Sequence, residues 1–570
     1  MKNKFLLPFS LLAVLALTGC TTTVLKGEKS TDSSSSITDA EVSGSTTEVE
    51  IVEDTVVSSF SLKDASGNSL TASDGIYTIT TAGEFTAAGK LTGQIRVKAS
   101  NQNVTLALNG VSIESTSVSP IYVEDCADIN LKVNNGTTNY LYDNRTTDYS
   151  ATNSSDGKGA IHVENGDLKI KGKGTLSIVS LANSGIHGKD NVSVKNVTML
   201  IKAVNNGIRG NDKVTIEEEP VLGIVAGNNG IVTHNSDKGI NAQHGYIYIT
   251  GGTITINSYG DAIDAAYAVE ISQGTDSDGN TYTPTLDLYT NKYSSYTLST
   301  TGSNSSNSLG IRGGPGGGNP GGGGFGGGGF TGGSSAEKAD DSAKGIKASE
   351  SIDISAGTIF SYTYDDGIHT NAVKLDTGVT SSANINISGG TLKIKASDDG
   401  VHADKTLNIT GGVVYVAESH EGVEANILNI KGGELTVFGD DDGVNASNQI
   451  NISGGRVDVT VSPNGDTDGI DSNGTITITG GAVITRGPNS EMASPLDADG
   501  TIKIAGGTTI VVGYANGRFT TQNVTKTTTS NGLSAGDHTV SVDGATITYN
   551  NSYSYSGSVT VYGSGTATVK

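Results

Sequence analysis

Apolar and polar residues alternate in short runs along most of the chain. A typical run, INISGGTLKIKASDDG at 385–400, has apolar residues at every second position on both sides of a Gly-Gly pair. Alternation with a period of two predicts β-strands with one buried face, and the Gly-Gly pair predicts a tight bend between two of them. Helical patterns of comparable length are absent from the sequence. The pattern therefore predicts an all-β protein.

This run is one copy of an internal repeat. Further copies occupy 246–261, 407–422, 428–443, 450–465, 476–489 and 502–517. A third short strand follows the next glycine, as in GIHTN at 367–371, so each copy predicts three strands in roughly 22 residues. Three strands per repeat describe one coil of a parallel β-helix, whereas a β-propeller needs four strands and about 40 residues.

The repeat also divides the chain. We expect the β-helix to span residues 51–517. Residues 310–335 contain 16 glycines, which predicts a flexible loop inserted between two coils. The alternative is a flexible flap at the rim of a ligand groove. Residues 518–570 lose the Gly-Gly pairs but keep a strand composition, and we expect them to form a C-terminal β cap over the last coil.

The N-terminus predicts where the protein resides. Lys2 and Lys4 precede a short apolar run that ends in Leu-Thr-Gly-Cys at Cys20, which resembles a bacterial lipoprotein signal. That resemblance implies a signal peptide over 1–20, ending at a lipidated Cys20, and a membrane-anchored lipoprotein at the cell surface. Residues 21–50 are rich in Ser and Thr and fit a disordered tether. An ordinary secretory signal is the alternative, and it also places the protein outside the cytoplasm.

Charge narrows the choice of partners. The chain carries 36 basic and 59 acidic residues, a net charge of −23, so nucleic acid is a poor partner. Cations, and ligands that are bridged by cations, suit this surface better. With 79 glycines and no tryptophan in 570 residues, the length indicates one repetitive domain, which we expect to be a monomer.

The acidic residues gather at two positions of the repeat. One set lies just before the glycine that opens the third strand, and the other lies two residues after that glycine, where alternation turns the side chain away from the core. Both sets are expected to form ladders along one edge of the solenoid. The candidate metal ligands are Asp365, Asp366, Asp398, Asp399, Asp404, Glu421, Glu424, Asp440, Asp441, Asp442, Asp466, Asp468 and Asp471.

Stacked carboxylates favour a bound cation. At the spacing of neighbouring strands they repel by about 1 kcal/mol in water and by about 3–4 kcal/mol at an effective dielectric of 20. Asp, Asn and carbonyl oxygens are hard donors that suit Ca²⁺, the leading cofactor candidate. The simpler explanation is that Asp and Asn occupy turn positions. Zinc is the weaker metal because His369, His402 and His420 come without HExxH or CxxC spacing, so we expect exposed histidines on an acidic ladder.

A family resemblance adds to this interpretation. The segment at 74–115, the Lys-Gly-Ile steps at 238–240 and 344–346, and the GI…ISGG coils resemble the bacterial carbohydrate-binding β-helix proteins of cellulose-degrading anaerobes, over about residues 70–515. The resemblance implies a right-handed, single-stranded parallel β-helix similar to pectate lyases. It further implies calcium binding, and binding of cellulose-like and polygalacturonate-like polysaccharides without established cleavage.

Three functions stay open at this point. The first is a non-catalytic, calcium-dependent protein that binds extracellular polysaccharide, with Tyr362, Tyr364 and Tyr415 as candidate sugar-binding rings. The second is a calcium-dependent pectate lyase, with a lysine that abstracts the proton next to the uronate carboxylate. The third is a structural or adhesive β-helix without a ligand site. The candidate lyase bases are Lys344, Lys347 and Lys238.

Overall fold

The structure is a computed structural model, and it describes residues 54–145, 157–233, 244–290, 342–375, 377–515 and 519–570. All regular elements in these ranges are β-strands, as predicted. No helix in the described ranges is long and apolar enough to cross a membrane. The predicted signal over 1–20, the tether over 21–50, the glycine-rich loop at 310–335 and Lys238 lie outside the described residues.

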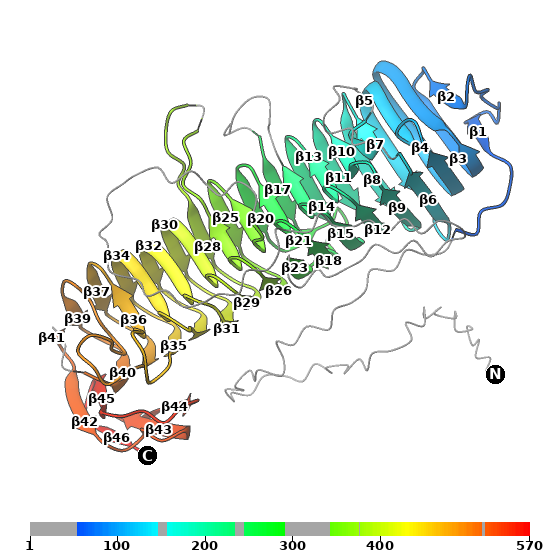
Figure 1. Ribbon diagram of the computed structural model, residues 1–570. Coiled ribbons are helices and arrows are strands. Elements are labelled where there is room, and N and C mark those ends of the chain that lie inside the picture. Colours follow the sequence, from blue (N-terminus) through cyan, green and yellow to red (C-terminus); the bar gives the residue numbers. More distant parts are fainter. Residues whose placement is uncertain (1–53, 146–156, 234–243, 291–341, 376, 516–518) are drawn as a thin grey trace, which may run out of the picture. The chain divides into compact units, whose positions relative to one another are not determined.

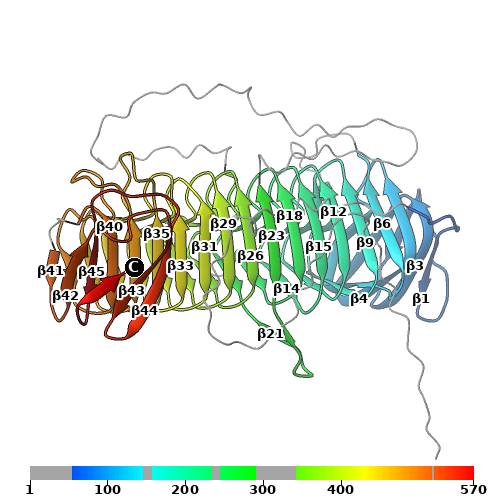
Figure 2. The same ribbon diagram turned by 90° about the horizontal axis from the view of Figure 1, so that it is seen from below.

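A coil of three strands is the repeating unit. In one coil, β27 (Ile368–Thr370), β28 (Asn384–Ile387) and β29 (Thr391–Ala396) follow one another, and each pairs in parallel with a strand of the next coil. Corresponding strands therefore stack into three faces, here called face 1, face 2 and face 3 in chain order (Figure 1). Figure 2 looks onto face 3. The parallel solenoid is thus present, and its right-handedness stays a prediction.

The strands are distributed over the faces as follows. Face 1 holds β7 (Gly159–Val163), β10 (Ser184–Gly188), β13 (Ile208–Gly210), β16 (Ile231–Thr233), β19 (Ile263–Ala265), β24 (Ile346–Ala348), β27 and β36 (Ile470–Ser472). Face 2 holds β8 (Asp167–Gly172), β11 (Asn191–Lys195), β14 (Lys213–Glu217), β17 (Tyr246–Ile249), β20 (Ala268–Ile271), β25 (Ser351–Ile354), β28, β37 (Thr475–Ile478), β39 (Ile502–Ile504) and β41 (Phe519–Thr521). In the later coils, three strands run from face 1 into face 2, namely β30 (Val401–Ile409), β32 (Val423–Ile430) and β34 (Val444–Ile452).

Face 3 is a continuous stack of parallel strands. It holds β6 (Thr138–Asp143), β9 (Thr175–Ser180), β12 (Thr198–Ala203), β15 (Val221–Ala226), β18 (Thr253–Ser258), β23 (Thr285–Thr290), β26 (Thr358–Thr363), β29, β31 (Val413–Glu418), β33 (Glu434–Phe438), β35 (Arg456–Thr460), β38 (Ala482–Arg486) and β40 (Thr508–Gly513). A short hairpin of β21 (Gly274–Thr275) and β22 (Thr281–Tyr282) projects between faces 2 and 3.

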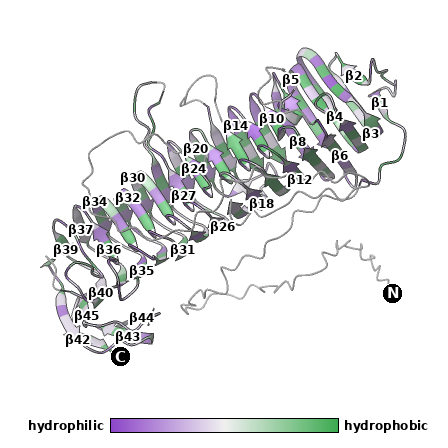
Figure 3. Cartoon of the chain, viewed as in Figure 1, coloured by the Kyte–Doolittle hydropathy of each residue, from purple (hydrophilic) through white to green (hydrophobic). Residues whose placement is uncertain are grey.

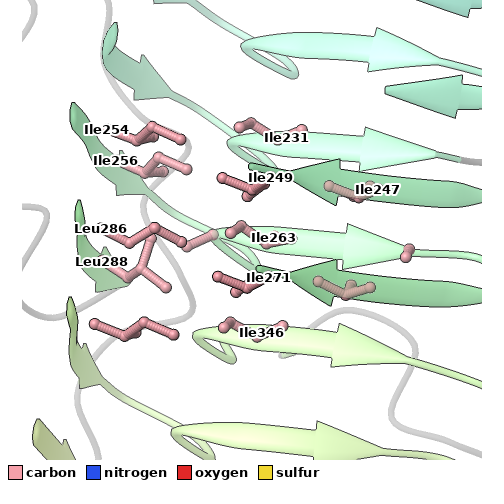
Figure 4. Packing of buried hydrophobic residues seen from close by; sticks show 14 of the residues in the cluster. Ile231, Ile247, Ile249, Ile254, Ile256, Ile263, Ile271, Leu286, Leu288 and Ile346 are labelled. Carbon is pink, nitrogen blue, oxygen red and sulfur yellow. The ribbon is translucent and has the colours of Figure 1, made fainter. Parts of the chain in front are cut away.

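Aliphatic side chains from all three faces fill the interior. Ile231, Ile263 and Ile346 stack in consecutive coils of face 1, and each is fully buried. Figure 4 shows this row meeting rows of isoleucine and leucine from faces 2 and 3. Figure 3 shows the matching alternation of hydropathy along the strands. Each buried side chain of this size contributes about 1.5–3 kcal/mol, so the repeated core supplies most of the stability.

Steric crowding explains why a glycine opens most of the face 1 strands. A Cβ atom on Gly422 would lie 2.0 Å from Cγ1 of Val437 and 2.3 Å from the carbonyl oxygen of Gly443, the corresponding glycine of the next coil. The Gly-Gly bend has a different cause at its second position, since Gly433 has φ of +77°, which residues with a Cβ rarely adopt. Two kinds of backbone constraint therefore produce the repeating glycines.

The two ends depart from the three-strand coil. At the N-terminus β1 (Ser61–Asp64), β2 (Ile76–Ile79), β3 (Gly83–Thr92), β4 (Gln94–Ser115) and β5 (Ile121–Val133) form the first, longer windings. At the C-terminus β42 (Thr525–Thr529) and β45 (Ser558–Gly563) are antiparallel, and β45 pairs with β40. A separate sheet contains β43 (Gly536–Val542), β44 (Ala545–Asn551) and β46 (Ala567–Val569). Pairing along β40 is what a cap requires, and the capping role itself stays a prediction.

Candidate functional site

The second residues of the face 1 strands form one register row, here called the face 1 ladder. Pairwise strand registers place each of these residues beside its counterpart in the next coil. From the middle of the solenoid onward the row contains Asp264, Lys347, His369, His402, Glu424, Asn445 and Asp471. The row that alternation predicted is therefore present in the fold. Its side chains point away from the apolar interior, but most are half-buried because neighbouring coils flank them.

The residues before the opening glycines form a second row, here called the pre-glycine column. Hydrogen bonds from Gly367 N–H to the Asp399 carbonyl (2.8 Å) and from Gly400 N–H to the Glu421 carbonyl (3.0 Å) connect successive coils. Side chains add a second connection, because Asp366 Oδ1 accepts the N–H of Asp399 (3.1 Å). Part of each carboxylate thus supports the backbone of the next coil. Such a turn role is compatible with a ligand role only where the other carboxylate oxygen has no partner of its own.

A lysine interrupts the acids at the start of the pre-glycine column. Lys344 Nζ lies 2.6 Å from Asp366 Oδ2 and 2.8 Å from Asp365 Oδ2. Burial alone would lower the pKa of Lys344, but the charges of Asp366 and Asp365 outweigh burial and raise this pKa above its usual value. The amine is therefore protonated at neutral pH. The ion pair with two acids therefore gives no support to Lys344 as the candidate lyase base.

Lys347, the second candidate base, also lies beside an acid. Lys347 Nζ lies 3.8 Å from Asp261 Oδ2 and 3.4 Å from the Ser342 hydroxyl. Asp261 is almost fully buried, and its Oδ1 accepts the backbone N–H of Lys344 at 2.8 Å. Lys347 therefore balances a buried carboxylate. Of the two candidate bases within the described residues, neither stands apart from acids.

Two histidines from consecutive coils stack within the face 1 ladder. The rings of His369 and His402 have centroids 4.3 Å apart and an interplanar angle of 9°. His402 Nδ1 contacts Asp399 Oδ2 at 2.8 Å, and His369 Nδ1 contacts Asp366 Oδ2. Burial would lower the pKa of His402, but Asp399 and Glu424 outweigh it and raise this pKa to about 9. His369 and His402 are thus held by carboxylates and largely buried, which corrects the expectation of exposed histidines for these two, whereas the side chain of His420 is 56% exposed.

A polar hollow opens over this part of the edge. Its volume is about 330 Å³. It is lined by Lys344, Asp366, His369, Asp398, Asp399, His402, His420, Glu421 and Glu424. Burial, followed by the charges of Glu424 and Asp399, raises the pKa of Glu421 to about 8. The lining of the hollow thus holds five carboxyl groups, three imidazoles and one lysine.

In the later coils, Asp442, Asp468 and Asp471 form no ion pair with a lysine of the described residues. Burial raises the pKa of Asp442 to about 6 and the pKa values of Asp468 and Asp471 to about 7, with neighbouring carboxylates adding to the shift. Asp442 Oδ1 accepts the N–H of Asp468 at 2.8 Å, which fixes the carboxylate. These half-buried acids repel one another as long as nothing positive lies between them. Their oxygens are the kind of donors that a hard divalent cation takes.

Other predicted ligands lie at the rim of this edge. Asp398, Asp440 and Asp466 are exposed, and Asp441 is half-exposed beside His420. Asp404 is two residues beyond His402, and its Oδ2 accepts the N–H of Ala372 at 2.7 Å. The structure thus divides the predicted acids into a half-buried set within the ladders and an exposed set outside them.

The predicted sugar-binding tyrosines differ in access. Tyr364 is 46% exposed and follows β26 at the edge that leads to the acids. Tyr362 is half-buried, with Lys395 Nζ 5.4 Å from its ring centroid. Tyr415 is 3% exposed and packs edge-on against Phe438 with centroids 6.0 Å apart. A ring without exposed surface cannot stack on a sugar, so Tyr415 is removed from the candidates.

The sequence interpretation missed one member of the face 1 ladder. Leu496 forms a parallel bridge with Ile470, and Asp497 donates its N–H to the Ile470 carbonyl at 2.9 Å. Asp497 therefore continues the row past Asp471, and its charge contributes to the raised pKa of Asp471. The sequence feature that could have identified Asp497 is the motif Pro-Leu-Asp at 495–497, in which proline replaces the usual glycine.

Comparison with known proteins shows which family the chain belongs to. The family model of the carbohydrate-binding domain-containing proteins matches residues 73–379, 373–422 and 421–569. The chain belongs to this family. A carbohydrate-binding domain-containing protein of Acetivibrio thermocellus is 30% identical over 274 residues, which cover 47% of this chain and 88% of the relative. A solved structure described as a polysaccharide lyase-like protein from C. thermocellum, in a gadolinium derivative, is 29% identical and covers 39% of this chain and 84% of that chain, with a TM-score of 0.34.

Proposed function

We propose that this protein is a non-catalytic, calcium-dependent polysaccharide-binding protein, displayed at the cell surface through a lipid on Cys20. Family membership supports a carbohydrate ligand. The observation that carries the calcium dependence is the run of half-buried acids Asp442, Asp468 and Asp471, which have no lysine partner among the described residues. Polygalacturonate-like and cellulose-like glycans are the proposed ligands.

The donor chemistry of the later coils fits calcium. Asp442, Asp468 and Asp471 project from adjacent coils toward one edge, and Asp497 continues their row. Calcium takes six to eight oxygens in flexible geometry, so carboxylates from neighbouring coils suit it and leave positions for ligand oxygens. Asp366 fits less well, because Lys344, His369 and the N–H of Asp399 already occupy its oxygens.

The residues suggest how an acidic protein holds an acidic polymer. A cation bound by Asp468 and Asp471 supplies positive charge where a uronate carboxylate approaches, and exposed Tyr364 offers an apolar ring farther along the same edge. Without the cation, the net charge of −23 repels polygalacturonate. Binding of uronate polymers is therefore expected to need calcium, whereas stacking on a neutral glucan depends less on it.

The test is retention on polygalacturonate with calcium or with a chelator. Wild type is expected to bind in calcium and to lose most binding in chelator. Asp468→Asn with Asp471→Asn is expected to reduce retention strongly, because both proposed ligands lose their negative charge. Asparagine keeps an acceptor oxygen where Asp468 Oδ1 accepts the Ser494 N–H, so this backbone hydrogen bond is preserved. Asp440→Asn with Asp466→Asn is the matched control, because those acids are exposed. Retention that ignores the chelator would refute the calcium bridge.

The same samples separate the alternatives. Release of unsaturated uronate, followed by ultraviolet absorbance, would establish a lyase. The ion-paired Lys344 gives no support for that outcome. Absence of binding to every glycan tested, with intact folding, would favour a structural or adhesive role.

A further inference from the structure

Three tyrosines gather on the outer side of face 2, a different face from that of the acids, and are here called the tyrosine cluster. Tyr246 and Tyr248 lie two residues apart in β17, so both side chains point away from the apolar interior. Their rings are nearly parallel, with an interplanar angle of 7° and centroids 5.7 Å apart. The ring of Tyr267, just before β20 in the next coil, has its centroid 5.1 Å from that of Tyr246. All three side chains are half-buried, so part of their aromatic surface meets solvent.

Backbone hydrogen bonds fix the tyrosine cluster in place. The Tyr267 N–H donates to the Gly245 carbonyl at 2.9 Å, and the Tyr267 carbonyl accepts the N–H of Glu350 at 2.8 Å. Ala268 is the register partner of Tyr246, and its small side chain leaves room beside Tyr246 for the Tyr267 ring. The rings are thus in position before a ligand arrives, which lowers the ordering cost of binding.

Tyr248 also belongs to a register row of polar side chains along face 2, here called the face 2 row. Strand pairing places each member beside its counterpart in the next coil. The row runs through Tyr248, Glu270, Asp353, Asn386, Asn408, Asn429 and Asn451. Its strands are β17, β20, β25, β28, β30, β32 and β34, which follow one another along the solenoid in Figure 1. At about 4.8 Å between neighbouring strands, the row is about 30 Å long.

The asparagines of the face 2 row form a ladder of hydrogen bonds. Asn386 Nδ2 donates to Asp353 Oδ1 at 2.7 Å, and Asn408 Nδ2 donates to Asn386 Oδ1 at 2.8 Å. Asn429 and Asn451 continue the ladder in the same direction, at 3.0 and 2.9 Å. A side-chain amide has two N–H donors and two acceptor lone pairs, so each rung uses only part of its capacity. The four amides are half-buried, so a ligand can reach the remaining donors and acceptors.

We propose that the face 2 row is a binding track for one extended, neutral glycan chain, in which a sugar ring packs on Tyr248 and sugar hydroxyls hydrogen-bond to the asparagines. This inference rests on the proposed function, because that function makes polysaccharide the ligand. A hydroxyl both donates and accepts, so it matches an amide that has a donor and an acceptor to spare. The ladder presents such an amide in successive coils, which suits a polymer whose hydroxyls also repeat.

Charge favours a neutral chain over a uronate polymer on this face. Glu270 is exposed and Asp353 is half-buried, and both belong to the row itself. Burial, and then the charge of Glu350, raise the pKa of Tyr246, so a third acid acts on the tyrosine cluster. Lys213, the register partner of Tyr246 in the preceding coil, offsets one of these charges. The remaining negative charge repels uronates, whereas a neutral chain needs no bridging cation, so binding is expected to be independent of calcium.

The first experiment titrates the full chain with cellobiose and with cellohexaose in chelator and follows the heat of binding. Wild type is expected to bind cellohexaose at least about tenfold more tightly, because the longer oligomer contacts more of the row. Tyr248→Ala is expected to weaken cellohexaose binding about tenfold and Asn408→Ala about fivefold, through a lost ring contact and lost hydrogen bonds. Tyr248→Phe keeps the ring and is expected to stay within about threefold of wild type.

Matched controls come from the C-terminal part of the chain. Tyr553 is 47% exposed, and Asn550 Nδ2 donates to Asp537 Oδ1 on an exposed surface. Tyr553→Ala and Asn550→Ala are expected to bind cellohexaose like wild type. Wild-type affinity that is equal for the two oligomers would overturn the track, and this result needs no variant to fold. Unchanged cellohexaose affinity in both Tyr248→Ala and Asn408→Ala would also overturn it and would leave the ladder a purely structural role.

A parallel measurement separates this inference from the proposed function. Retention of Tyr248→Ala and Asn408→Ala on polygalacturonate in calcium is expected to match wild type. A wild-type chain that binds polygalacturonate but not cellohexaose would refute the track alone. Loss of cellohexaose binding in the variant with Asp468→Asn and Asp471→Asn, but not in Tyr248→Ala, would place the neutral chain on the acidic edge and refute the track as well. Thermal unfolding of each variant checks that lost affinity is not lost structure.

Discussion

Arg486 connects the C-terminal sheet to the last coils of the solenoid, and its replacement by methionine tests how strongly the two are joined. The side chain is 1% exposed. Its Nη1 donates to Asp458 Oδ1 at 2.6 Å and to the Val459 carbonyl at 3.0 Å, and its Nε donates to Asn551 Oδ1 at 3.0 Å. Asn551 belongs to β44, whereas Asp458 belongs to β35, so one guanidinium joins two sheets.

The structure sets the size of the effect. Removing one partner of a buried ion pair costs about 3–5 kcal/mol, because the other partner is left uncompensated. Arg456 Nη2 also contacts Asp458, at 2.5 Å, so that carboxylate keeps one cation. The expected cost of Arg486→Met is therefore at the lower end, about 3 kcal/mol. Methionine keeps most of the apolar stem, so packing changes little.

Hydrogen exchange of the amides in β43, β44 and β46 is the appropriate assay, because a stacked solenoid need not unfold in one step. A loss of about 3 kcal/mol corresponds to exchange that is more than about a hundredfold faster in these strands. Face 1 amides in the middle of the solenoid are expected to keep wild-type rates.

Arg456→Met is the matched control. Arg456 also contacts Asp458 and donates to the Thr548 carbonyl at 3.0 Å, but its side chain is 31% exposed. Its loss is expected to cost less than about 1 kcal/mol. Equal exchange in the two variants would contradict the role of burial in this argument. Exchange in Arg486→Met that matches wild type would show that apolar contacts alone hold the C-terminal sheet.

Three further predictions concern the solenoid itself. Gly422→Ala is expected to destabilise by about 3 kcal/mol or more through its clash with the next coil, whereas Gly279→Ala, with φ of +84° and open space, should cost only about 1 kcal/mol in chemical denaturation. Lys344→Met should lower the melting temperature more in chelator than in calcium, because a cation can replace the lost ammonium beside Asp366; equal losses would argue against it. Burial lowers the pKa of His187, so its protonation favours the unfolded chain; stability should fall as pH drops below the unfolded value of about 6.5, and His187→Asn should flatten that slope in melts across pH 5–7.

Much of the fold was predictable because it repeats. The alternation around each Gly-Gly pair identified strands such as β29 and β31, and the register of the face 1 ladder followed from the fixed two-residue period of a strand. Where the repeat loses its glycine, as at Pro495, the same coil position was missed although Asp497 occupies it. Local pattern is informative in a solenoid because each coil contacts mainly its neighbours.

By itself the sequence determined the three-strand coil, the stacking of acids along one edge and the negative charge that disfavours nucleic acid. Only the tertiary structure decided how individual side chains in those rows are used. It pairs Lys344 with Asp366, buries Tyr415 and brings His369 and His402 to one oxygen of Asp404. The physical reason is that spacing along the chain fixes which row a residue joins, whereas burial, rotamers and the contacts between coils fix its partners and its charge.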